Sequence, residues 1–278
     1  MLGKLLKYEY KALAKQLVPM IICMFVLATV NALILKIQTE FTTYDYYSYD
    51  EPMMGLGRAI SASFGVLSIL VFIAFSVVFT VLILRRFYKN FFSDEGYLTH
   101  TLPVSTTKQL IAKLVSGSLW TIIAVIASMI SIAVLVLFGT AEKGAVINAD
   151  AFGLVFEFIR NLNSEALLYA FEIILLLLVN IPYMLLLCYL SITIGSIIAK
   201  KHKILAAVGI YFAISTVLSI IQSIFNVFML AGTMDTNIFG LASMIHSQII
   251  FQIVICTITA IVAFVVCNRI LAKKLNLD

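Results

Sequence analysis

Residues 85–113, RRFYKNFFSDEGYLTHTLPVSTTKQLIAK, interrupt a sequence that is otherwise almost continuously apolar. Basic residues open and close this stretch, and an acidic turn with the sequence DEG lies inside it. Pro103 disfavours helix at the residue before it, and Ser105, Thr106 or Thr107 can cap a helix that begins just afterwards. The stretch therefore predicts a soluble insertion, with one short helix, between two membrane spans.

The composition excludes an ordinary soluble domain. Of the 278 residues, 62% are hydrophobic and 12% are charged, and the mean hydropathy is +1.08. Soluble domains have an apolar share near half and about 25% charged residues. We therefore expect an all-α polytopic membrane protein. The net charge of +5 does not indicate a nucleic-acid partner, because the basic residues lie between apolar runs, where the positive-inside rule accounts for them.

Six apolar runs are long enough to cross a hydrocarbon core of about 30 Å at about 1.5 Å per residue. We expect a single transmembrane domain over residues 1–278, with spans at about 17–35, 62–84, 110–138, 166–199, 204–230 and 248–271. The expected loops are a cytoplasmic coupling loop at 85–109 and extracellular loops at 36–61, 139–165 and 231–247.

Three segments carry more specific expectations. Leu5–Gln16 is amphipathic, with lysines on one side, and predicts an N-terminal interfacial elbow helix that leads into the first span. The fourth span is longer than a bilayer requires, so it must tilt, kink at Pro182 or project beyond the membrane. Residues 231–247 are short and apolar, which favours a hairpin that dips into the outer leaflet.

The distribution of charge predicts the orientation. With both termini in the cytoplasm, the cytoplasmic segments hold most of the 19 Lys and Arg residues. The outer segments hold four of them, Lys36, Arg58, Lys143 and Arg160. We expect a multi-pass protein of a bacterial-type plasma membrane.

Sequence motifs give no sign of a catalytic site in this chain. There is no GxxxxGK[ST] phosphate loop and no GxGxxG, HExxH or GxSxG motif. His100, His202 and His246 lie on different loops or faces, so they predict no metal or triad site. The cysteines fall in predicted spans without a CxxC pair, and we expect packed free thiols. They are Cys23, Cys188, Cys256 and Cys267.

Polar residues inside the spans are candidates for a translocation path or a helix interface, and their spacing leaves both alternatives open. They are Ser68, Ser76, Glu172, Asn180, Ser215, Ser219, Gln222 and Asn226. Glu172 is the only acidic residue within a predicted span and is therefore a candidate functional residue. The sequence indicates no intramembrane partner for it, which weakens the case for a proton relay.

The central stretch resembles a known family. The residues Glu95-Gly96, Leu98, Leu102-Pro103-Val104-Ser105, Lys108 and Lys113 are similar to the segment between spans 2 and 3 of ABC-2 type transporter permeases. The aromatic run Phe87–Phe92 is similar to the small permeases of bacterial peptide exporters, such as the phenol-soluble modulin exporter. The resemblance implies a coupling helix that docks on a separate ATP-binding subunit. The residues it assigns to coupling are Asp94, Glu95, Gly96, Tyr97, Leu98, His100, Leu102 and Pro103.

The resemblance also implies a function. A permease of this family forms a dimer, here expected to be a homodimer, around a central path and works by alternating access. ATP and Mg are bound by the partner subunit, so this chain is expected to carry no cofactor and to be no enzyme itself. The aromatic and mildly polar surfaces suit an amphipathic substrate such as a membrane-active peptide, and membrane lipid is the other expected partner. The alternatives are an ATP-independent secondary transporter with Glu172 in proton coupling, or a non-transporting immunity or scaffold protein.

Overall fold

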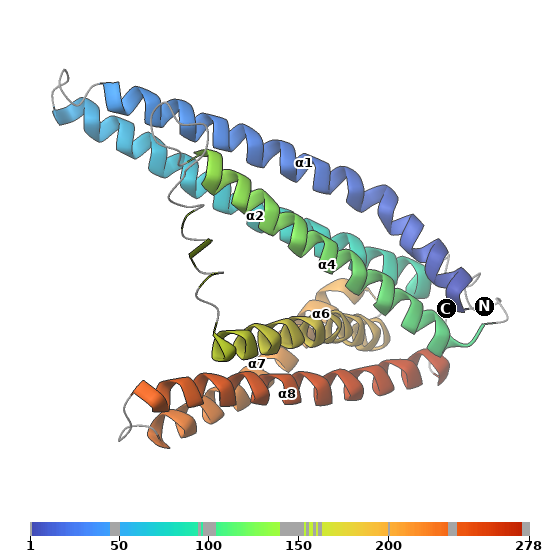
Figure 1. Ribbon diagram of the computed structural model, residues 1–278. Helices are drawn as coiled ribbons and strands as arrows, with labels where there is room; N and C mark the ends of the chain where they lie inside the picture. Colours follow the sequence, from blue (N-terminus) through green and yellow to red (C-terminus); the bar gives the residue numbers. More distant parts are fainter. Residues whose placement is uncertain are drawn as a thin grey trace. The chain divides into compact units, whose positions relative to one another are not determined.

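The computed structural model describes residues 2–44, 51–93, 96, 104–139, 153, 156–157, 160, 163–199, 201–232 and 238–273. The long helices are α1 (Leu2–Tyr44), α2 (Glu51–Phe92), α4 (Thr106–Gly139), α6 (Ser164–Ile198), α7 (Lys203–Gly232) and α8 (Ile238–Lys273) (Figure 1). All six are long and apolar enough to cross a membrane, and the described residues include no strand. The expected all-α fold with six spans is therefore confirmed.

The chain divides into two compact units. Unit 1 comprises Met1–Tyr10, Leu84–Leu119 and Asn163–Asp278, and unit 2 comprises Lys11–Ile83 and Trp120–Leu162. Helices α6, α7 and α8 belong wholly to unit 1, whereas α1, α2 and α4 contribute residues to both units. Unit 1 thus contains the end of α2 and the start of α4, which are the two helix ends that flank the predicted coupling segment.

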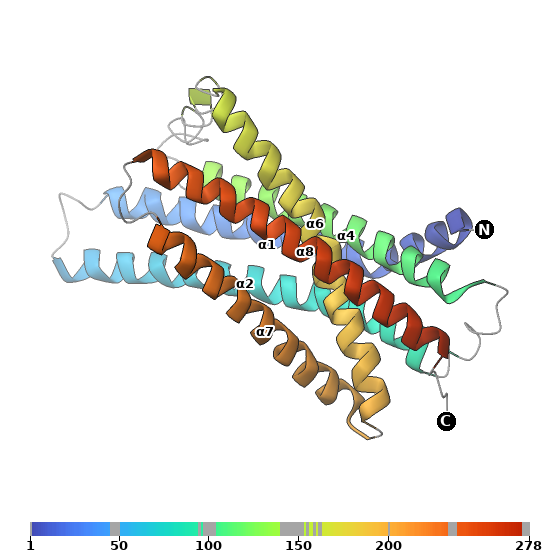
Figure 2. The same cartoon turned by 90° about the horizontal axis from the view of Figure 1, so that it is seen from below.

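Helix α6 is the central helix of the α6–α8 group in unit 1. It packs extensively against both α7 and α8, which contact each other much less (Figures 1 and 2). Tyr183 and Leu187 on α6 form a buried cluster with Cys256 on α8. The helix begins after Asn163, whose Oδ1 accepts a hydrogen bond of 2.9 Å from the Ala166 amide, as is typical of an N-cap. It then continues without interruption through Pro182.

The junction between α6 and α7 requires a glycine. A Cβ atom on Gly195 would lie 2.6 Å from the amide nitrogen of Ala207 and 2.7 Å from its Cα. Both of these are backbone atoms of α7, so no side-chain rotation can relieve the overlap. The end of α6 and the start of α7 therefore approach each other backbone to backbone.

The expected elbow helix and the first span form one continuous helix, α1. The reason is a single buried face that runs through both segments at helical spacing. Its buried residues are Glu9, Leu13, Leu17, Met24, Ala28 and Ala32. Pro19 lies inside the helix without ending it. Within the stretch that predicts the elbow, α1 buries Glu9 and Leu13, whereas Tyr8 is 71% exposed.

Two other boundaries differ from the sequence-based expectation. Helix α2 continues through residues 85–92, because Phe87 and Phe91 are only 1% and 0% exposed and a helix buries both on one face. Residues 238–247, expected in an outer loop, belong to α8, while residues 233–237 of the expected hairpin lie outside the described residues. In a continuous helix the backbone N–H and C=O groups bond to each other within the segment. Apolar surroundings favour this arrangement, because they offer these groups no other partners.

Candidate functional site

The predicted coupling residues lie almost entirely outside the described residues. Those outside are Asp94, Glu95, Tyr97, Leu98, His100, Leu102 and Pro103. Gly96 is described, and its amide donates a hydrogen bond of 2.7 Å to the Ser93 carbonyl. A Cβ atom on Gly96 would lie 2.8 Å from the Phe91 carbonyl oxygen, so this position favours glycine. The geometry of the site is therefore built from the helix ends on either side.

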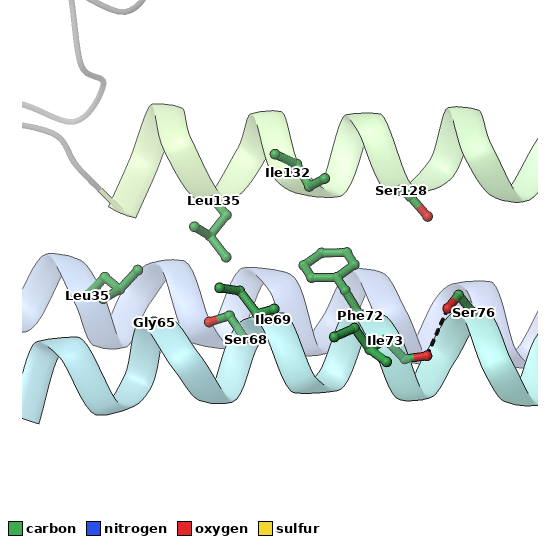
Figure 3. A pocket seen from close by; sticks show the side chains of 10 residues that line it. All are labelled: Leu35, Gly65, Ser68, Ile69, Phe72, Ile73, Ser76, Ser128, Ile132 and Leu135. Carbon is green, nitrogen blue, oxygen red and sulfur yellow. Dashed lines mark hydrogen bonds between the residues drawn. The ribbon is translucent and has the colours of Figure 1, made fainter. Parts of the chain in front are cut away.

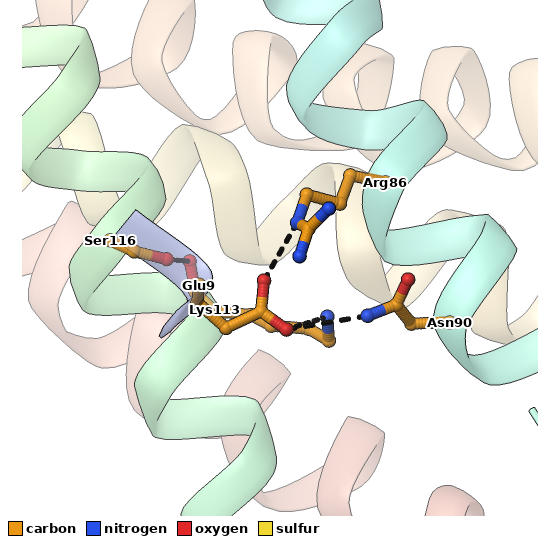
Figure 4. A network of polar contacts seen from close by, with 5 residues as sticks. All are labelled: Glu9, Arg86, Asn90, Lys113 and Ser116. Atoms are coloured by element: carbon orange, nitrogen blue, oxygen red, sulfur yellow. Dashed lines mark hydrogen bonds and ion pairs between the residues drawn. The ribbon is translucent and has the colours of Figure 1, made fainter. Parts of the chain in front are cut away.

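A cluster of charged residues joins three helices in unit 1 (Figure 4). Glu9 on α1 accepts a hydrogen bond of 2.7 Å at Oε2 from Arg86 Nε on α2. Its Oε1 accepts one of 2.9 Å from Lys113 Nζ on α4 and one of 3.3 Å from Asn90 Nδ2 on α2. The side chains of Glu9 and Lys113 are 11% and 6% exposed, and Arg86 is 27% exposed. The Glu9 carboxylate thus contacts two largely buried cations.

Aromatic rings extend this cluster, which we call the Glu9 cluster, toward α6. Lys113 Nζ lies 5.6 Å from the centre of the Phe91 ring, at the distance of a cation–π contact. The Phe91 ring lies 5.1 Å from Phe87, and Phe87 stacks on Tyr189 of α6 at 4.0 Å with nearly parallel planes. Tyr189 is 1% exposed. The end of α2 is therefore held by packing on α6 as well as by charge.

The start of α4 has a second attachment, to α8. The Ser105 carbonyl accepts hydrogen bonds from the amides of Lys108 and Gln109, and α4 begins at Thr106, directly after Ser105, the first of the three predicted capping residues. Thr107 Oγ1 donates a hydrogen bond of 3.1 Å to Asn268 Oδ1 near the end of α8. Both helix ends that flank the predicted coupling segment are thus fixed to other helices of unit 1.

Two of the predicted path residues, Ser68 and Ser76, line a cavity of about 540 Å³ in unit 2 (Figure 3). The lining is largely apolar and includes Phe72 and Ile132. Ser68 and Ser76 donate hydrogen bonds of 2.8 Å to carbonyl groups of their own helix, and Ser128 does the same on α4. These hydroxyl protons are already used, so the cavity presents a mainly apolar surface to whatever occupies it.

Glu172 on α6 has a partner that the sequence did not indicate. His246 Nδ1 on α8 lies 2.5 Å from Glu172 Oε1. The Glu172 side chain is 11% exposed, and the His246 side chain is 41% exposed. Glu172 Oε2 is buried and has no hydrogen-bond partner in the part of the chain that the structure describes. The expectation that Glu172 lacks a basic partner is therefore wrong.

Gln222 also finds its partner within the chain. Its Nε2 donates to Gln252 Oε1 on α8, and Gln252 Nε2 donates a hydrogen bond of 3.3 Å to Cys256 Sγ. The rings of Phe225 and Phe251 stack nearby at 3.5 Å between the same two helices. Gln222 therefore lies in a contact between α7 and α8.

The remaining candidates are not brought together. Ser215 and Ser219 on α7 donate hydrogen bonds of 2.8 and 2.9 Å to carbonyls of their own helix. Asn226 is exposed on α7, and Asn180 is half-buried on α6. The polar stripe on α7 therefore combines an internal contact, made by Gln222, with an exposed face that includes Ser219 and Asn226.

The sequence does not reveal the contacts that Glu9 and His246 make. Glu9 precedes Leu13 and Leu17 at intervals of four residues, so helical spacing places it on the same face as two apolar residues. This spacing predicts that the Glu9 side chain lies on the buried face of its helix. His246 gives no such signal, because the sequence predicts a loop at 231–247, whereas the structure places His246 inside α8.

The site offers no sign of metal chemistry within the described residues, which contain no group of three or more His, Cys, Asp or Glu side chains that could hold an ion. All four cysteines are free, as expected. In comparisons with known proteins, the chain matches no family model, no curated protein and no solved structure. Its likeness to ABC-2 type permeases therefore depends on the motif residues themselves.

Proposed function

We propose that this chain is the membrane-spanning permease subunit of an ABC exporter, which moves an amphipathic substrate outward with ATP hydrolysed by a separate subunit. The observation that carries the proposal is the family-like segment between α2 and α4 in a protein with six span-like helices. The helix ends that border this segment are anchored by the Glu9 cluster and by the contact with Asn268. Such anchoring suits a segment that must transmit a push from another protein.

The proposal places both termini and residues 93–105 on the cytoplasmic side. The positive-inside distribution supports this orientation. ATP and Mg then belong to the partner, because the sequence has no phosphate loop. A second copy of the chain completes the path between two permease subunits.

An amphipathic substrate, such as a membrane-active peptide, fits the surfaces better than a hydrophilic polymer does. The cavity in unit 2 is mainly apolar, and the hydroxyl protons of its three serines are already bonded to carbonyls. A polar chain would lose hydrogen bonds to water there without replacing them, at a cost of roughly 1–3 kcal/mol per group. An apolar side chain meets no such cost.

The first prediction tests the assignment of the partner. An affinity-tagged full chain, expressed in its source cells, should capture a subunit with a GxxxxGK[ST] phosphate loop, identified by mass spectrometry. Deletion of residues 94–105 should lower this capture about tenfold or more, equivalent to about 1.4 kcal/mol, while the protein stays membrane-inserted. Glu95→Ala should impair coupling in the same direction, because it changes the acidic turn.

Glu165→Gln is the matched control for Glu95→Ala, because it removes one carboxylate at an exposed site on α6. It should leave capture unchanged. Full capture and full transport after the deletion would contradict the coupling assignment. Failure of the intact chain to capture any ATP-binding subunit would contradict the proposed function itself.

A secondary transporter is the second candidate, and the contact between Glu172 and His246 favours it. A buried carboxylate that meets an imidazole inside a membrane span is a typical element of a proton pathway. Transport that depends on a proton gradient, needs no ATP-binding subunit and is abolished by Glu172→Gln would replace the exporter with this candidate.

A further inference from the structure

The Glu9 cluster is unusual because one acid from the start of the chain contacts both helices that border residues 93–105. Arg86 and Asn90 lie within about two turns of the end of α2, and Lys113 lies within about two turns of the start of α4. Both carboxylate oxygens are used, Oε2 by α2 and Oε1 by α2 and α4. Glu9 therefore sets the spacing between these two helix ends.

The charge balance makes this contact hard to replace. Lys113 is almost fully buried, and the Glu9 carboxylate faces it at 2.9 Å. If either helix end moved away, a cation and a carboxylate would separate in surroundings of low polarity, where an unpaired charge is strongly disfavoured. The two helix ends should therefore move together with α1 and not independently of each other.

The aromatic contacts connect the same cluster to the α6–α8 group. Phe91 lies beneath Lys113, and Phe87 stacks on Tyr189 in the middle of the buried part of α6. A displacement at the end of α2 must therefore shift the ring stack against α6. The N-terminal part of α1 and the buried face of α6 are thus linked by an unbroken series of contacts.

We propose that Glu9 is the positioning residue of the coupling site: it holds the end of α2 and the start of α4 as one frame, so that a push on the segment between them reaches the membrane helices. This inference rests on the proposed function for its role in transport. The frame itself is a property of this chain alone and can be measured without any partner.

The test uses hydrogen exchange of the full chain in lipid nanodiscs, read by mass spectrometry. Glu9→Gln should raise amide exchange about tenfold or more in residues 86–93 and 106–113, because the frame loses its carboxylate. Exchange in α7 should stay unchanged. Glu165→Gln, the matched loss of one exposed carboxylate, should change neither region. Unchanged exchange at the helix ends, or an equal rise throughout the chain, would overturn the proposal.

A double variant separates positioning from simple charge compensation. Glu9→Gln with Lys113→Gln has the same net charge in the cluster as the natural protein, since one acid and one base are lost together. Positioning predicts that exchange at the helix ends remains high in this variant, whereas compensation alone predicts that it returns to normal. Glu9→Asp, which retains the carboxylate on a shorter stem, should restore part of the protection. A full return in the double variant would overturn the proposal.

The last arm examines function in the captured complex. Glu9→Gln should lower the stimulation of ATP hydrolysis by a synthetic amphipathic Leu/Lys peptide about tenfold or more relative to the natural complex. Retained stimulation would overturn the role in coupling. If the natural chain captures no ATP-binding subunit, the proposed function fails, whereas the exchange measurements still decide whether Glu9 holds the frame.

Discussion

Glu9 and Glu172 are both buried acids of unit 1, but their surroundings differ. Both oxygens of Glu9 accept hydrogen bonds, from two cations and an amide. Glu172 has one oxygen beside His246 and one buried oxygen without a partner in the described residues. Because an unsatisfied buried acceptor is costly, the Glu172 site depends heavily on its single contact. Removal of the contact with His246 should therefore lower the stability of the protein.

His246→Leu should therefore destabilise the protein more than Glu172→Gln. The leucine leaves a buried carboxylate with no partner, at a cost of about 3 kcal/mol, while glutamine leaves a neutral group. We expect the midpoint of thermal unfolding in detergent to fall by about 5–10 °C for His246→Leu. The double variant should recover part of the loss. Equal effects of the two single changes, with no recovery, would show that the contact contributes little.

The sequence does not predict which residues Glu9 and Glu172 contact. Glu9 pairs with residues 77 and 104 positions away, and helical spacing shows only which side of its own helix it occupies. His246 was assigned to a loop because the hydropathy of residues 231–247 is interrupted by small and polar residues. The presence of polar groups on a helix face is thus predictable, but their partners depend on how the helices pack.

At the scale of elements, hydropathy predicts the spans well and their ends poorly. Five of the six predicted spans lie within helices of the structure, and the fourth, 166–199, passes the end of α6 by one residue. Residues 85–92 look like a loop, because they hold Arg85, Arg86 and Lys89, yet they extend α2. Burial of Phe87 and Phe91 outweighs the polar residues there. An apolar stripe within a charged stretch is therefore the better guide to where a helix ends.

The crossing of α6 and α7 gives a prediction at this scale. Gly195→Ala should lower stability by about 1–3 kcal/mol, because the added Cβ overlaps backbone atoms of Ala207 and forces the helices apart. Gly209→Ala on α7 is the matched control, since nothing lies within 4 Å of its added Cβ. It should be neutral or stabilise α7 by up to about 1 kcal/mol. Thermal unfolding in detergent compares the two, and equal effects would argue against the close crossing.

At the scale of the whole molecule, α7 has a polar face that its own chain leaves exposed. The exposed residues follow intervals of three and four and are Thr216, Ser219, Ser223 and Asn226. The hydroxyls of the first three donate to carbonyls of α7 itself. Asn226 has no hydrogen bond within the described part of the chain. A side-chain amide needs hydrogen-bond partners, and the hydrocarbon of a lipid bilayer supplies none. Gln222 needs no such outside partner, because its amide donates a hydrogen bond to Gln252 on α8.

We therefore expect Asn226 to meet a second copy of the chain or a water-filled path. Asn226→Cys and Ser219→Cys, on a background with exposed Cys23 replaced by alanine, should either cross-link between subunits or react with a water-soluble thiol reagent. Phe228→Cys is the control on the same helix, because Phe228 is 76% exposed and lies about 200° around the helix from Asn226. It should react only with a lipid-dissolved reagent. If residues 219 and 226 behave like residue 228, the polar face meets the bilayer, and the proposed homodimer would have to form through another surface.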